Sequence, residues 1–379
     1  MSENIVPLVF IFVMSGLTSF FSTRFVKRLA ERLGAIDRPD DRKFHREDTP
    51  RLGGLAIIAG FAFPLTLIPI SKHAAQLVSK NLAYLFAVLA AGCLMIALGV
   101  YDDLVGSNAT KKFSVQGAAA LILVAFGFSF RSISVGGWVL DLGVLGVAAS
   151  IVWIVGVINA FNFIDGIDSL ATVVALTIAV AFMIIAVLRH DIFSLVIMTA
   201  LAGSLAGFYP WNKPPAKIFM GDTGSLFIGL LLAACSIARP AKSPVALIIG
   251  GPILALALPV IDTLIVMKQR FGGPTATLGA RITRMFNADR RHMHHILVAK
   301  YGSDGKAVLS IWALTLVFGV AAVLTAIEEL KLYGYFCAIA GLLTMLLLRY
   351  GRSPSDAAAG PNGDAAKAPP EQAVSAQGH

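Results

Sequence analysis

Charged residues are scarce in this sequence of 379 residues, and cysteine is scarcer still. Only 14% of the residues are charged while 57% are hydrophobic, and the mean hydropathy is +0.78. Soluble domains are about a quarter charged, so the composition excludes an ordinary soluble domain and predicts an integral membrane protein. The three cysteines, Cys93, Cys235 and Cys337, are scattered within apolar segments. Neither a disulfide framework nor a thiolate metal site is therefore expected.

Acidic residues are fewer than basic ones, which gives a formal net charge of +9. A basic excess can indicate nucleic-acid binding, but no basic stripe interleaved with aromatic residues is present. Membrane proteins gather Lys and Arg on their cytoplasmic side. We therefore expect contact with membrane lipid and no nucleic acid partner.

Apolar runs of about twenty residues, the length that crosses a bilayer, recur along the chain. They cover residues 4–23, 52–70, 82–101, 115–130, 143–161, 169–188, 192–209, 222–238, 244–267, 307–327 and 332–349. No small-residue cleavage site follows the first run, which favours a spanning helix over a signal peptide. The predicted fold is an all-α polytopic membrane protein with about eleven transmembrane helices.

The loops between these runs differ in charge. Most of the 31 Lys and Arg residues fall in the odd-numbered loops and the C-terminal tail. The positive-inside rule then places the N-terminus outside and the tail in the cytoplasm. Residues 1–352 form the predicted membrane domain. Residues 353–379, rich in Ala, Pro and Gly, are expected to be a disordered cytoplasmic tail.

Four aspartate-bearing motifs lie where the apolar runs begin or end, and all four fall in odd-numbered loops. They are Tyr101-Asp102-Asp103-Leu104, Asn162-Phe163-Ile164-Asp165-Gly166-Ile167-Asp168, Phe219-Met220-Gly221-Asp222-Thr223-Gly224-Ser225 and Asp289-Arg290-Arg291-His292-Met293-His294-His295. A carboxylate near lipid is costly unless it has a partner, so repeated ones indicate a functional site. We expect one active site on the cytoplasmic face.

Adjacent carboxylates at Asp102 and Asp103 oppose the helix dipole, which favours cations at a C-terminus. Oxygen ligands of this kind suit Mg²⁺, which usually binds through one or two carboxylates and substrate phosphates. A solvated helix end is the alternative for this pair. Asp165, Asp168 and Asp222 are alternatively helix caps, but capping does not explain the surrounding Asn162 and glycines.

The histidine cluster of the ninth loop, with Arg281, Arg284, Arg290 and Arg291 nearby, predicts an anion site for a diphosphate. Its spacing does not match a zinc site. A solvated basic loop would explain the arginines but not the histidines. In the first loop, the basic residues are expected to contact lipid headgroups or an anionic substrate, and His45 is expected to be incidental.

Six segments together resemble the polyprenyl-phosphate N-acetylhexosamine-1-phosphate transferases, the glycosyltransferase 4 family. The likeness runs in order from about residue 37 to 302. It comprises Arg42-Lys43-Phe44-His45 with Thr49-Pro50-Arg51-Leu52-Gly53-Gly54, Asp102-Asp103-Leu104, Lys112-Phe113 with Gln116, Asn162 to Asp168, Asn212 to Ser225, and His292-Met293-His294-His295.

The resemblance implies transfer of a sugar 1-phosphate from a UDP-sugar to undecaprenyl phosphate, with Mg²⁺, or Mn²⁺ as a substitute, and release of UMP. It implies that Asp222 ligates the metal and that Asp102 and Asp103 are catalytic; whether Asp102 is a base, a nucleophile or a metal ligand stays open. The implied substrate-binding residues are Lys112, Asn162, Asp165, Asp168, Asn212, Phe219, His292, His294 and His295.

Within the family, Met293 interrupts the three consecutive histidines that are usual in the peptidoglycan branch. The resemblance therefore favours UDP-N-acetylglucosamine, or the UDP derivative of a close N-acetylhexosamine, as donor. It implies the start of an O-antigen-like envelope polysaccharide in a bacterial inner membrane, with a homodimer left open. A phospho-N-acetylmuramoyl-pentapeptide transferase is the alternative within the family. A transporter of phosphorylated lipid or sugar is the alternative of another class, but transporters place charged sites near the midplane, whereas these acids lie at span ends.

Overall fold

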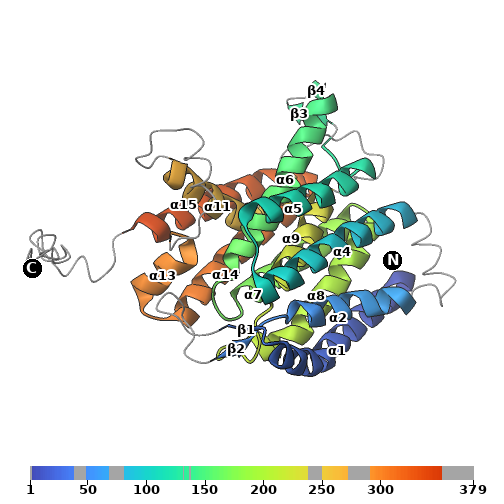
Figure 1. Cartoon of the computed structure of the whole chain (residues 1–379). Coiled ribbons are helices and arrows are strands. Elements are labelled where there is room, and N and C mark those ends of the chain that lie inside the picture. The colour runs from blue at the N-terminus through green and yellow to red at the C-terminus, as the bar shows by residue number, and fades with distance from the viewer. Residues whose placement is uncertain are drawn as a thin grey trace, which may run out of the picture.

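The computed structural model describes residues 2–37, 48–67, 81–130, 132–135, 138–237, 250–271 and 291–351. Within these ranges the chain is almost entirely helical, and the arrangement is shown in Figure 1. His45, the loop arginines Arg281, Arg284 and Arg290, and the predicted tail 353–379 lie outside the described residues.

Seven helical segments within the described ranges are long and apolar enough to cross a membrane. They are Ile5–Leu33 within α1 (Ser2–Leu33), α4 (Leu82–Val105), α6 (Gly143–Ile164), α7 (Leu170–Leu188), α8 (Ile192–Asn212), α14 (Asp304–Thr325), and η2 (Glu328–Leu330) joined to α15 (Lys331–Tyr350). Two shorter apolar helices are α2 (Gly54–Leu67) and α9 (Gly221–Ile237). The all-α polytopic class is thereby confirmed, while the total of eleven spans stays a prediction.

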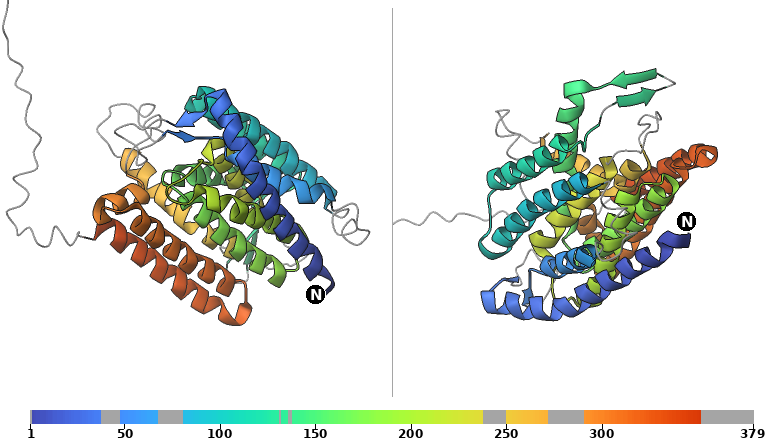
Figure 2. Two further views of the ribbon diagram at one scale, coloured as in Figure 1. Left: turned by 90° about the horizontal axis from the view of Figure 1, so that it is seen from below. Right: turned by 90° about the vertical axis from the view of Figure 1, so that its right-hand side faces the viewer.

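The remaining elements of the described ranges are four helices and two hairpins. The helices are α5 (Ala109–Ala125), α10 (Gly251–Ala255), α11 (Ala257–Phe271) and α13 (Met293–Tyr301). The antiparallel hairpins pair β1 (Ile36–Asp37) with β2 (Thr49–Pro50), and β3 (Ser132–Val135) with β4 (Trp138–Asp141). The second hairpin projects from the helices ahead of α6, as Figure 2 shows.

The ninth predicted span, 244–267, was expected to be continuous, but its described part consists of α10 and α11. Pro259 lies in the first turn of α11. Proline has no amide hydrogen, and its ring clashes with the carbonyl four residues earlier, so a helix cannot run through it undisturbed. The break follows from that residue.

Helix α9 lies at the centre of the bundle, where every residue from Thr223 to Ile237 is buried. A helix that is apolar on all sides is expected to be enclosed by protein. Glycines bring its neighbours close: a Cβ on Gly54 would lie 2.1 Å from the Gly224 nitrogen, and one on Gly99 would lie 2.4 Å from the Thr223 Cα. Helices α2 and α4 thus fix where α9 begins.

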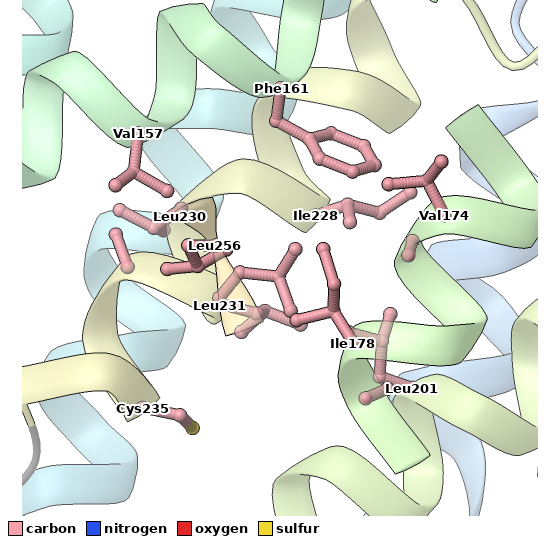
Figure 3. Close-up of a cluster of buried hydrophobic side chains, with 14 of the residues drawn as sticks. Val157, Phe161, Val174, Ile178, Leu201, Ile228, Leu230, Leu231, Cys235 and Leu256 are labelled. Carbon is pink, nitrogen blue, oxygen red and sulfur yellow. The ribbon is translucent and has the colours of Figure 1, made fainter. Parts of the chain in front are cut away.

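After its first turn, α9 packs into an apolar core with side chains from α6, α7 and α8. Figure 3 shows part of that core, including Val157, Phe161, Val174, Ile178, Leu201, Ile228, Leu230, Leu231, Cys235 and Leu256. Lipid is as apolar as these side chains, so close packing rather than exclusion of water stabilises such a core. The outer helices α1 and α15 expose large apolar side chains such as Phe21 and Phe336, as expected for surfaces that face lipid.

Candidate functional site

The ammonium group of Lys112, the fourth residue of α5, contacts two aspartates. One belongs to the first aspartate motif and the other to the start of α9. Lys112 Nζ lies 2.9 Å from Asp102 Oδ2 and 2.5 Å from Asp222 Oδ2. All three side chains are partly exposed. Burial opposes the charged form of Lys112, but the carboxylates of Asp222 and Asp102 outweigh it and raise the lysine pKa. Two carboxylates and one lysine therefore form a charged cluster that remains open to a ligand.

Asp103 faces the other way and is buried. Its Oδ1 accepts the Asp222 amide at 2.9 Å, and its Oδ2 accepts the Thr223 amide at 3.0 Å and the Thr223 hydroxyl at 2.6 Å. These are amides of the first turn of α9, which have no partner within their own helix. Asp103 thus caps α9 and holds Asp222 in place.

The second motif adds Asn162, the antepenultimate residue of α6, to this cluster. Its Nδ2 donates to Asp222 Oδ1 at 3.0 Å and to Ser225 Oγ at 2.8 Å. Asp165, the C-cap of α6, follows. Burial and the negative charges of Asp222 and Asp103 raise the pKa of Asp165 to about 8. A cation bound nearby would lower this raised pKa and stabilise the ionised carboxylate. The surroundings of Asp165 therefore favour binding of a cation.

Asp168, Asn212 and Phe219 fix the loop that leads into α9. Asp168 Oδ2 accepts the Ala216 amide at 2.8 Å. Asn212 is buried, accepts the Thr172 hydroxyl at 2.7 Å and donates to the Ile218 carbonyl at 3.1 Å. The contacts show a scaffold role for Asp168 and Asn212, while their part in substrate binding stays a prediction.

The first loop supports the same segment through backbone hydrogen bonds. The Phe219 amide donates to the Pro50 carbonyl, and the amides of Gly53 and Gly54 donate to the carbonyls of Phe219 and Met220. A Cβ on Gly53 would lie 2.5 Å from the Phe219 carbonyl oxygen, so glycine is required for this approach. The first loop therefore helps to set the position of Asp222.

The histidine cluster lies against the second motif at the start of α13. His294 Nε2 would lie only 2.5 Å from a Cβ on Gly166, and the His292 ring centroid lies 5.2 Å from that of Phe163. The His292 and His294 rings are nearly parallel, with centroids 6.1 Å apart. Burial and the neighbouring histidines hold the pKa of His294 well below its ordinary range. The lowered pKa favours the neutral form of the His294 imidazole, which carries one hydrogen-bond donor and one acceptor.

Sequence reasoning missed Asp262 and Arg349, two buried residues behind the histidines. Arg349 Nη1 forms an ion pair with Asp262 Oδ1, and Asp262 Oδ2 lies 2.9 Å from His292 Nδ1. The signal was available, because Asp262 is an acid inside the apolar run 244–267 and such acids usually mark function.

The four motifs thus meet at one end of the helix bundle. Hydrogen bonds and ion pairs connect Asp102, Lys112, Asn162 and Asp222, and Asp103 accepts the Asp222 amide. The charge of Asp222 acts on Asp165, and His294 lies against Gly166 of the second motif. Within the described residues no group of three or more His, Cys, Asp or Glu side chains is arranged to hold a metal ion. Asp102 and Asp222 each place a carboxylate oxygen on the Lys112 ammonium, so the two carboxylates lie close together. The pair nevertheless fits Mg²⁺, since this ion needs only one or two carboxylates besides phosphates and water.

Comparison with known proteins adds independent findings. Residues 85–239 match the family described as glycosyl transferase family 4. The chain is similar to the probable undecaprenyl-phosphate N-acetylglucosaminyl 1-phosphate transferase of Bacillus subtilis, with 31% identity over 85% of this chain and 86% of the relative. It is similar to the decaprenyl-phosphate N-acetylglucosaminephosphotransferase of Mycobacterium tuberculosis H37Rv, with 35% identity over 83% and 82%. It is also similar to the phospho-N-acetylmuramoyl-pentapeptide-transferase of Lactococcus lactis subsp. cremoris, with 31% identity over 81% and 91%.

Proposed function

The chain belongs to glycosyl transferase family 4, and on that premise we propose that it transfers N-acetylglucosamine 1-phosphate from UDP-N-acetylglucosamine to undecaprenyl phosphate. UMP is released, and the lipid-linked product starts an envelope polysaccharide such as an O-antigen. The observation that carries the proposal is the cluster in which Lys112 contacts both Asp102 and Asp222. This cluster combines one positive side chain with two carboxylates and is partly exposed. The lysine, with a metal ion on the carboxylates, could bind two phosphate groups.

In this proposal Asp222 ligates Mg²⁺, or Mn²⁺ as a substitute, and Asp102 contributes to the same site. The ion supplies charge neutralisation on the phosphate oxygens and orientation of the two substrates. Asn162 orients Asp222 through its hydrogen bond to Oδ1. Asp103 keeps Asp222 at the start of α9 by capping that helix.

The reaction needs little chemistry from the protein beyond alignment. A phosphate oxygen of undecaprenyl phosphate attacks the phosphorus that is bonded to the sugar, and a new P–O bond forms. The bond from that phosphorus to the bridging oxygen breaks, and UMP leaves with that oxygen. A phosphate monoester is largely ionised at neutral pH, since its second pKa is about 6, so the acceptor needs no strong base. Lys112 stabilises the negative charge that approaches Asp102 and Asp222.

The choice of N-acetylglucosamine rests on relatives rather than on a contact of Met293. Two of the relatives above carry N-acetylglucosamine in their names, with 31% and 35% identity. The Met293 side chain is apolar and packs in the apolar core, so it offers the donor no hydrogen-bonding group. Transfer of phospho-N-acetylmuramoyl-pentapeptide remains the second candidate, because the relative of that name is also 31% identical.

The proposal also places the site on the cytoplasmic side of a bacterial inner membrane, where soluble UDP-sugars are made. The positive-inside distribution of Lys and Arg supports this orientation. Undecaprenyl phosphate would reach the site from the surrounding lipid, and a homodimer is compatible with the apolar outer helices α1 and α15.

The decisive experiment incubates the purified protein with undecaprenyl phosphate, Mg²⁺ and either donor, and follows UMP and the lipid product. We expect UMP with UDP-N-acetylglucosamine and several-fold less with UDP-N-acetylmuramoyl-pentapeptide. The reverse preference would replace the donor while keeping the reaction. Release of UDP instead of UMP would contradict transfer of a phosphosugar.

A further inference from the structure

Asp262 is a buried carboxylate that joins three elements behind the histidine cluster. Its Oδ1 forms an ion pair with Arg349 near the end of α15 and accepts the Met293 amide at 3.1 Å. Its Oδ2 lies 2.9 Å from His292 Nδ1. Arg349 also donates to the Arg291 carbonyl at 2.7 Å. The carboxylate therefore connects α11, the start of α13 and α15.

The ion pair alone would satisfy the charge of Asp262. A buried carboxylate is stable when an opposite charge and further hydrogen bonds match it, and Arg349 with the Met293 amide supplies both. The second oxygen is nevertheless directed at an imidazole. The contact with His292 is not required to keep Asp262 buried. We therefore ask what the contact does to His292.

The contact determines which imidazole nitrogen of His292 carries hydrogen. A carboxylate only accepts hydrogen bonds, so Nδ1 of His292 must be the donor. In a neutral ring the lone pair then lies on Nε2. Among the described residues His292 Nε2 has no hydrogen-bond partner, although it is buried. The same holds for Nε2 of His294, whose ring lies parallel to that of His292.

We propose that Asp262 is a positioning residue that fixes the tautomer and orientation of His292, so that Nε2 accepts a hydrogen bond from a hydroxyl or N–H group of the nucleotide-sugar donor. The proposal rests on the proposed function for the identity of that ligand. Arg349 balances the charge of Asp262, so the pair orients His292 without placing a net charge beside it. The Phe163 ring, 5.2 Å away, covers one side of the imidazole.

The test is a double-mutant cycle on the full-length protein with Asp262→Asn, His292→Ala and both together. Each variant is measured for its Kd for UDP-N-acetylglucosamine by calorimetry and for its kcat/KM in UMP release. We expect each single change to weaken donor use about tenfold, the size of one lost hydrogen bond. The double variant should be no weaker than His292→Ala, because Asp262 acts through His292. The KM for undecaprenyl phosphate should not change.

Controls separate this role from a merely structural one. Asp191→Asn removes a carboxylate that caps α8 by accepting the Ser194 amide at 3.1 Å, and it should leave the donor Kd unchanged. If Asp262→Asn does not accumulate in membranes, Asp262→Glu replaces it in the cycle, since it keeps a charge for Arg349 while displacing the contact with His292.

The outcomes are distinct. If the two single effects on donor Kd multiply to about a hundredfold in the double variant, Asp262 does not act through His292. A donor Kd unchanged by Asp262→Asn or Asp262→Glu would also contradict its role. Both results leave the proposed function intact. A wild-type protein that binds the donor but releases no UMP contradicts the transfer reaction and still allows the cycle to be read from Kd. A wild-type protein that binds no UDP-sugar contradicts both proposals.

Discussion

Thr223 donates two hydrogen bonds to one oxygen of Asp103, from its amide at 3.0 Å and from its hydroxyl at 2.6 Å. The other oxygen of Asp103 accepts the Asp222 amide. The positive end of the α9 dipole favours a carboxylate at this place. Asp102, the preceding residue, instead contacts Lys112 and Ser107. Two adjacent acids that look alike in the sequence therefore have different surroundings.

This difference predicts different effects of two matched substitutions. Asp103→Asn should lower the free energy of unfolding by about 1–3 kcal/mol, because an amide nitrogen would then face buried N–H donors. Asp102→Asn should reduce UMP release strongly while leaving stability nearly unchanged, because Asp102 is partly exposed. Thermal unfolding in detergent and the UMP assay measure both. A wild-type melting temperature for Asp103→Asn would show that its cap contributes little.

Asp222→Asn should reduce turnover by at least about a hundredfold, since it removes one charge that holds a divalent ion against two phosphates. The protein should still fold, because the Asp222 amide keeps its hydrogen bond to Asp103. Wild-type activity should disappear with EDTA and return with Mg²⁺ or Mn²⁺. Undiminished turnover in the variant would remove Asp222 from the metal site.

The sequence was sufficient to predict that the four motifs belong together. Three of the motifs lie at the ends of apolar runs and the histidine motif lies in the ninth loop. The alternation of loops puts all four at the same end of a helix bundle. The contacts among Asp102, Lys112, Asn162 and Asp222 confirm that these residues meet. Which side of the membrane that end faces stays a prediction from the charge of the loops.

The roles inside the site could not be predicted, because they depend on which helix end meets which side chain. Nothing in the pair Asp102-Asp103 indicates that only the second caps α9. The contact between Asp262 and His292 joins residues 30 positions apart, and no local pattern encodes it. The division of the ninth span was predictable in principle from Pro259, whereas its hydropathy alone indicated one continuous helix.

Gly166→Ala should impair donor use by about tenfold, the effect of about 1–3 kcal/mol of overpacking. The new Cβ would lie 2.5 Å from Nε2 of His294, which is buried and has little room to move. Gly156→Ala in α6 is the matched control, since a Cβ there meets no atom within 4 Å. Donor kcat/KM and Kd measure the effect. Equal values for the two variants would show that His294 does not touch the second motif closely.

The orientation predicted from the loop charges can be tested with reporters fused after residue 352. A reporter that is active only outside the cytoplasm should give no signal, because the tail is expected to be cytoplasmic. The control fusion is a reporter active only in the cytoplasm at the same position, which should be active. The opposite pattern would put the site end on the outer side.

Lys112→Gln should lower turnover and, at the same time, lower the Mg²⁺ concentration needed for half-maximal activity. The ammonium contacts the same carboxylates, Asp102 and Asp222, that are proposed for the metal. Lysine and the ion therefore compete electrostatically for these oxygens, and removal of one positive charge strengthens binding of the other. Turnover falls because Lys112 also balances charge when both phosphates are bound.

The neighbouring Lys111 provides the control for this prediction. Lys111 is exposed and its ammonium lies over the Tyr101 ring, 5.3 Å from the centroid. Lys111→Gln removes the same charge from the same helix turn but not from the two carboxylates, so both turnover and the Mg²⁺ requirement should stay at wild-type values. Mg²⁺ titrations of UMP release measure both quantities. A higher Mg²⁺ requirement in Lys112→Gln would mean that the lysine assists metal binding, and Asp102 and Asp222 would then not share one ion in the way proposed.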